Sequence, residues 1–103
     1  MAATPQPVFT PDASAGVSAG PASAAFALPG TPASDTTLRV ANVGSMPVYC
    51  KLGASSAVTV TNSTGLCVMP GRTEYLGIGA NTWIAITTGT LGTSSTVNLT
   101  TGN

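Results

Sequence analysis

The sequence predicts an all-β fold: a small β-sandwich or jelly-roll-like barrel of about seven strands, with an extended Pro/Ala-rich N-terminal arm. Thr, Ser, Val and Gly dominate the second half of the chain, where apolar and polar residues alternate with a period close to two. Prolines gather instead in the first third. We therefore expect an arm over residues 1–35 and one β-sandwich domain over residues 36–103.

The first 35 residues hold six of the eight prolines, set among Ala, Ser, Thr and Gly. Proline fixes φ and lacks an amide hydrogen, so neither a central strand nor a helix interior is predicted here. Two interpretations are open, a disordered tail and an extended arm that orders when it docks on a partner. The spacing of the apolar residues favours the arm, and we expect its anchors to be Val8, Phe9, Phe26 and Leu28.

From residue 36 onward, short alternating segments are separated by turn residues such as Pro70-Gly71. Regularly spaced short strands of this kind are typical of a sandwich or barrel. The strands are expected at 36–41, 48–52, 58–61, 66–68, 74–78, 83–87 and 97–99.

The segment 83–87 is apolar on both faces, so it is expected to run through the middle of the sandwich or to contact a neighbouring subunit. Trp83 is predicted to fill the core in preference to anchoring an interface. The aromatic candidates for core or subunit interface are Trp83, Tyr49 and Tyr75.

Charge is scarce: three Lys or Arg residues and three Asp or Glu residues give a net charge of zero. Zero net charge favours association, so we expect a subunit bound to copies of itself or to a larger surface. A domain this small also tends to need oligomerisation for stability. Without a cluster of Lys or Arg, neither nucleic acid nor a membrane is an expected partner. The first residues lack the pattern of a signal peptide, which predicts folding in a cytoplasm.

Cys50 and Cys67 are expected to be reduced thiols, because two cysteines make no disulfide framework and a cytoplasm is reducing. Cys50 is in phase with Val48 and Leu52, which predicts that it is buried as a small apolar residue.

The residues that catalysis uses are missing or isolated. The chain has no histidine, the commonest general base and metal ligand, and it has only three carboxylates. Its many Ser and Thr residues have no activating partner in sight. We therefore expect no enzyme, no metal and no cofactor.

Three features carry a resemblance to small structural proteins of tailed bacteriophages: the opening of the first expected strand (38–44), the small-residue turn into a Val/Thr strand (52–59), and the Met-Pro-Gly turn followed by Trp-Ile-Ala-Ile-Thr (69–71 and 83–87). Within that group the chain most resembles capsid decoration, or cement, proteins.

The resemblance implies a protein of the outer capsid surface, made in the bacterial host cytoplasm, that bridges capsomers. It also implies a homo-oligomer, a trimer before a dimer, fastened to the major capsid protein by its N-terminal extension. The alternative is a carbohydrate-binding or receptor-binding β-module of a head fibre or tail, with Trp83, Tyr49 or Tyr75 as its stacking platform.

Overall fold

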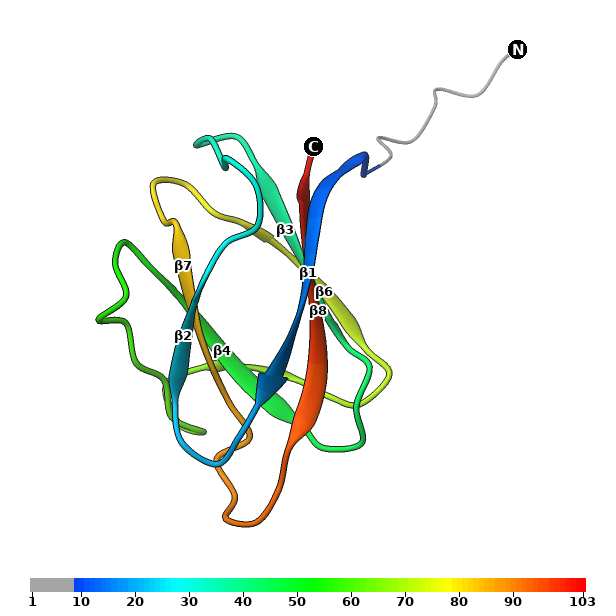
Figure 1. Cartoon of the computed structure of the whole chain (residues 1–103), viewed down its shortest axis with the longest axis vertical. Coiled ribbons are helices and arrows are strands. Elements are labelled where there is room, and N and C mark those ends of the chain that lie inside the picture. The colour runs from blue at the N-terminus through cyan, green and yellow to red at the C-terminus, as the bar shows by residue number, and fades with distance from the viewer. Residues whose placement is uncertain (1–8) are drawn as a thin grey trace.

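Two four-stranded antiparallel sheets face one another in the computed structural model, which describes residues 9–103 (Figure 1). Sheet A has the strand order β1-β8-β3-β6, and sheet B has the order β2-β7-β4-β5. Every connection along the chain passes from one sheet to the other, except the one from β4 to β5. The strands are β1 (Pro11–Ala19), β2 (Ala24–Ala27), β3 (Thr37–Asn42), β4 (Val48–Gly53), β5 (Leu66–Val68), β6 (Thr73–Gly77), β7 (Trp83–Thr87) and β8 (Ser95–Gly102).

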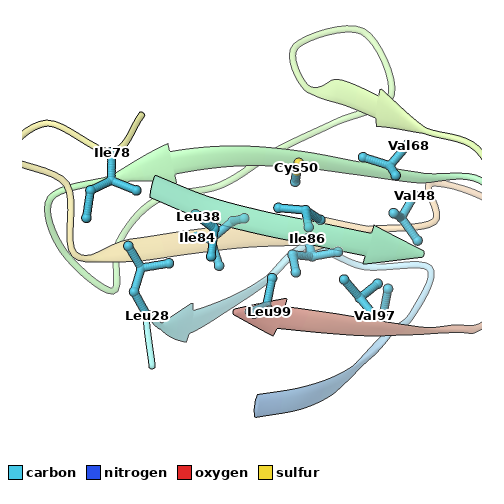
Figure 2. Packing of buried hydrophobic residues seen from close by; sticks show 12 residues of the cluster. Leu28, Leu38, Val48, Cys50, Val68, Ile78, Ile84, Ile86, Val97 and Leu99 are labelled. Atoms are coloured by element: carbon cyan, nitrogen blue, oxygen red, sulfur yellow. The ribbon is translucent and has the colours of Figure 1, made fainter. Parts of the chain in front are cut away.

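Apolar side chains from alternate strand positions fill the space between the sheets (Figure 2). Leu38 and Val40 enter from sheet A, Ile84 and Ile86 enter from sheet B, and all four are fully buried. Burying a side chain of this size stabilises a fold by roughly 1.5–3 kcal/mol, so this layer is the main source of stability. The buried cluster consists of Ala19, Leu28, Leu38, Val40, Val48, Cys50, Val68, Ile78, Ile84, Ile86, Val97 and Leu99.

The coarse prediction is confirmed, since the chain is all-β with two antiparallel sheets. Six of the expected strands correspond to β3 through β8, and β7 is an interior strand as its apolar faces indicated. The expected strand at 58–61 does not form. Two further strands form in the Pro-rich segment, so that the described residues contain eight strands.

The structure corrects the expected arm, because β1 and β2 are members of the two sheets. β1 pairs with β8, and β2 pairs with β7. The prolines do not prevent this, since Pro11 begins an edge strand while Pro21 and Pro29 lie in the connections. The described strands therefore do not follow the boundary expected at residue 35.

Asn42 links the two sheets at one end of the sandwich. Its Nδ2 donates to the carbonyl oxygens of Met46 and Val68, at 2.7 and 2.9 Å. Its Oδ1 accepts from the amide of Gly44 at 3.1 Å and from the hydroxyl of Ser95 at 2.7 Å. These hydrogen bonds join β3, β5, β8 and the loop after β3. Asn42 is 1% exposed, so they are shielded from water.

Leu28→Ala is expected to destabilise the monomer by about 2–5 kcal/mol, because Leu28 is 5% exposed inside the core. Urea unfolding followed by circular dichroism measures this change. Leu91→Ala is the matched control: Leu91 is 90% exposed, and its truncation should change the free energy of unfolding by less than about 0.5 kcal/mol. A Leu28→Ala protein as stable as wild type would mean that the segment is a free arm after all.

Asn42→Ala should lower the free energy of unfolding through the groups that lose a partner. The bonds to Val68 and Ser95 are both buried, and each buried polar group left without a partner costs about 1–3 kcal/mol. Thermal and urea unfolding would report the loss. Asn62→Ala, at an exposed position, serves as the control. Equal stability of the two variants would show that the sheets do not depend on this amide.

Candidate binding surfaces

The outer face of sheet A carries a network of polar side chains that crosses three strands. Asn98 Nδ2 donates to Ser14 Oγ at 3.1 Å, and Thr100 Oγ1 lies 3.2 Å from the same oxygen. Arg39 Nη2 donates to Thr100 Oγ1 at 3.2 Å and more weakly to Asn98 Oδ1 at 3.4 Å. These residues alternate with core residues along β1, β8 and β3, so the strand period alone brings them onto one face.

Phe9 and Tyr75 add an aromatic pair beside this network. Their ring centroids are 5.5 Å apart with an interplanar angle of 66°, an edge-to-face arrangement. The guanidinium carbon of Arg39 lies 6.0 Å from the centroid of Phe9. Tyr75 is opposite Arg39 in the pairing of β6 with β3, and 55% of its surface is exposed. Phe9, Arg39 and Tyr75 are called the aromatic–arginine cluster below.

The electrostatics of this cluster are unusual because its cation has neutral partners. Both described hydrogen-bond acceptors of Arg39 are uncharged side chains. Its Nε is buried and makes no hydrogen bond within residues 9–103. A guanidinium binds most strongly to a carboxylate, through two parallel hydrogen bonds. The cluster is thus suited to a partner that brings an acidic side chain.

The outer face of sheet B is different, because the loop of residues 54–65 crosses it. In Figure 1 this loop, drawn in green, runs outside sheet B on the side away from sheet A. Val58 lies so close to Gly53 that a Cβ there would overlap it, and Val60 packs in the same way against Gly65. The amide of Val60 donates to Ser23 Oγ at 3.0 Å. Val60 is 3% exposed although it is no member of the core cluster.

A groove of about 380 Å³ lies between this loop and the start of β2. Its polar lining is uncharged and therefore suits a neutral ligand bound through hydroxyl or amide groups. Part of that lining is occupied, since Thr87 Oγ1 donates to the carbonyl oxygens of Gly20 and Pro21, each at 3.1 Å. The groove is lined by Pro21, Ser23, Thr59, Val60, Thr61, Asn62, Thr87 and Gly89, none of them aromatic.

The residues expected at a binding site are distributed over three places. Phe9 and Tyr75 meet on the outer face of sheet A. Phe26 and Leu28, expected as docking anchors, instead pack in the core of the sandwich. Val8 lies outside the described residues.

Trp83 and Tyr49 are half-buried on the outer face of sheet B. Trp83 therefore does not fill the core as expected, because Ile84 and Ile86 on either side of Ala85 turn inward and leave Trp83 on the opposite face.

Sequence reasoning did not identify Arg39 as a candidate, nor the Ser14, Asn98 and Thr100 network around it. Local alternation shows only that Arg39 faces away from Leu38 and Val40. Arg39 lies opposite Tyr75 only because β3 pairs with β6, a segment far from it in the chain.

The two cysteines are free, as expected, and Cys50 is buried while Cys67 is exposed. Burial raises the pKa of the Cys50 thiol from 9.0 to about 11, with smaller contributions from the Glu74 carboxylate and Cys67. A thiol that stays protonated at neutral pH is a poor nucleophile. Within residues 9–103 no group of His, Cys, Asp or Glu side chains is arranged to hold a metal ion. No helix in this part of the chain is long and apolar enough to cross a membrane.

No protein-family model, curated protein or solved structure matches the chain.

The free energy of unfolding is expected to fall as the pH rises from about 9 to about 11. The unfolded Cys50 thiol ionises near 9.0 whereas the folded thiol keeps its proton up to about 11, so the unfolded state binds fewer protons in this window. The loss is roughly 2–3 kcal/mol once both values are passed. Urea unfolding at pH 8 and pH 11, compared between wild type and Cys50→Ala, isolates this contribution.

Cys67→Ala is the control for this comparison, since Cys67 is exposed and its removal should leave the decline in place. If Cys50→Ala lost stability over the same window as steeply as wild type, the decline would have another origin.

Proposed function

We propose that the protein is a structural virion protein that binds the outer surface of a bacteriophage capsid and stabilises it by bridging capsomers. The observation that carries the proposal is the aromatic–arginine cluster on sheet A. Tyr and Arg are among the side chains that most often dominate protein–protein binding energy, and the exposed Tyr75 lies beside a guanidinium whose described partners are neutral. The capsid protein would supply the carboxylate.

The strand topology supports this proposal by analogy. Within residues 9–103, eight strands form two four-stranded sheets, and every connection except that from β4 to β5 passes between the sheets, as in a jelly roll. Viral capsid domains use this fold, and so do lectins. Because a fold does not determine a function, the analogy only ranks these two classes above others.

The low charge agrees with a protein that works within an assembly. Many identical weak contacts on a symmetric lattice give strong attachment through avidity. A small neutral sandwich with one binding face is suited to such repetition, and its opposite face, with the loop of residues 54–65 across it, would point away from the shell. On this proposal the protein is made in the bacterial host cytoplasm and resides on the virion.

The second candidate is a carbohydrate- or receptor-binding module, favoured by the neutral groove beside the loop of residues 54–65. Sugar rings commonly bind by stacking on the faces of aromatic side chains, and no aromatic residue lines this groove. Trp83 and Tyr49 are half-buried and take no part in the groove. The capsid proposal is therefore preferred.

Tyr75→Ala and Arg39→Ala are each expected to weaken attachment to capsid shells by about thirtyfold, the equivalent of the roughly 2 kcal/mol that defines a binding hot spot. Co-sedimentation of the purified protein with shells of the same virus measures attachment. Both positions are on the sheet surface, so unfolding curves should show that the variants remain folded.

Arg72→Ala is the matched control, because Arg72 is exposed in the turn before β6 and makes no part of the cluster. Undiminished binding by both cluster variants would argue against this face as the attachment site. Absence of binding by the wild-type protein itself would contradict the proposed function.

A further inference from the structure

β1 is the longest of the edge strands within residues 9–103. It runs for nine residues, and within residues 9–103 it pairs on one side, with β8. The other side therefore presents backbone N–H and C=O groups that no described strand uses. An unprotected edge of this kind is a template for pairing with another strand.

The other edge strands have features that discourage pairing. β5 is three residues long, and β2 is four. β6 carries Glu74 opposite the core residue Val40, which places a charge on the inward side of the edge. Short strands and inward-pointing charges are both known protections of sheet edges. β1 has such features only at its first residues, where Pro11, the charge of Asp12 and the irregularity between Pro11 and Ala13 lie. The stretch from Ala13 to Ala19 has none of them.

The hydrogen-bonding direction along β1 follows from its neighbours. The amide of Val43 donates to the Thr96 carbonyl, so Thr96 turns its backbone groups toward the β3 side of β8. Backbone direction alternates along a strand, so Val97 and Leu99 turn toward β1 and bond with Val17 and Ala15. The intervening residues of β1 then direct their N–H and C=O groups to the free edge, and they are Ser14, Gly16 and Ser18.

We propose that β1 pairs antiparallel with β1 of a second copy of this chain, about a twofold axis at Gly16. Gly16 would lie opposite its own equivalent, and Ser14 would lie opposite Ser18, with each pair exchanging both N–H···O bonds. The two copies of sheet A then form one continuous sheet. This inference does not depend on the proposed function, and it favours a dimer over the trimer that the resemblance implied.

A second copy fits this edge because the strand is complementary to itself. In this register Ala15 is opposite Val17 on the inward side, so half-buried apolar residues of one copy cover those of the other. The regular pairing runs from Ala13 opposite Ala19, so Asp12 lies beyond its end and the two Asp12 side chains are kept far apart. The zero net charge of the chain adds no repulsion. A Cβ at Gly16 would meet no atom within 4 Å, which leaves that position open to substitution in the monomer.

Cysteine cross-linking tests both the pairing and its register. In a Cys67→Ser background, Gly16→Cys should give a disulfide-linked dimer under mild oxidation, since hydrogen-bonded opposite residues have Cα atoms about 5.5 Å apart. Ser18→Cys should stay uncross-linked, because its equivalent in the other copy lies four strand residues away, about 13 Å. Cross-linking of Ser18→Cys but not of Gly16→Cys would overturn the register.

Sedimentation velocity over a dilution series of the full chain tests the pairing without cross-links. Wild type should show a concentration-dependent dimer. Gly16→Lys should raise the dissociation constant of the dimer about fivefold, because the two introduced lysine charges would then lie directly opposite each other. Leu91→Lys, at a position 90% exposed in the loop between β7 and β8, should leave the constant unchanged. A wild-type protein that is monomeric throughout, or a dimer insensitive to Gly16→Lys, would overturn the proposal.

Discussion

The hydrogen bonds of the Asn42 side chain are the interaction on which much of the remaining structure depends. One amide holds β3 and the start of β8 in sheet A and the end of β5 in sheet B. Ser95 is the first residue of β8 and pairs with Ala19 of β1, so its hydrogen bond to Asn42 holds the start of β8 beside β3. The register of β8 against β1 and β3 places Asn98 and Thr100 beneath Arg39 and directs Ser14, Gly16 and Ser18 to the free edge. Burial of the core supplies most of the free energy of folding, but the hydrophobic effect is not directional. The hydrogen bonds of Asn42 are directional, so they specify which strand segments lie together.

The two outer faces of the sandwich offer different surfaces. Sheet A is open and presents aromatic rings and one cation above a network of hydroxyl and amide groups. Sheet B has a loop across it, and a neutral groove lies at that loop. A protein with six charged residues has few ways to attract a partner at long range, so recognition depends on short-range contacts. Within residues 9–103, the aromatic–arginine cluster and the free edge of β1 are two places where such contacts are available.

Part of the candidate site could be found from the sequence. Phe9 was expected as a docking anchor of the arm, and Tyr75 was a candidate for the core or a subunit interface. Their neighbour Arg39 was not, since its place between them follows from the pairing of β3 with β6 and from Phe9 lying against sheet A. Phe26 and Leu28 had the same apolar character as Phe9 and yet belong to the core. Residue type alone does not distinguish a docking anchor from a core residue.

The sequence by itself determined the all-β class, six of the strands between residues 36 and 103, and the burial of Cys50. These features follow from local alternation, because a period of two defines which side chains share a face. Whether two other segments form strands was determined only by the tertiary structure. Residues 11–27 are mostly Ala, Ser, Gly and Pro, a composition that does not predict a strand. They form β1 and β2 because they pair with the edges of β8 and β7. Residues 58–61 alternate like a strand but lie across sheet B, where Val60 is buried against Gly65. In both cases the stabilising contacts come from residues distant in sequence, which local alternation does not encode.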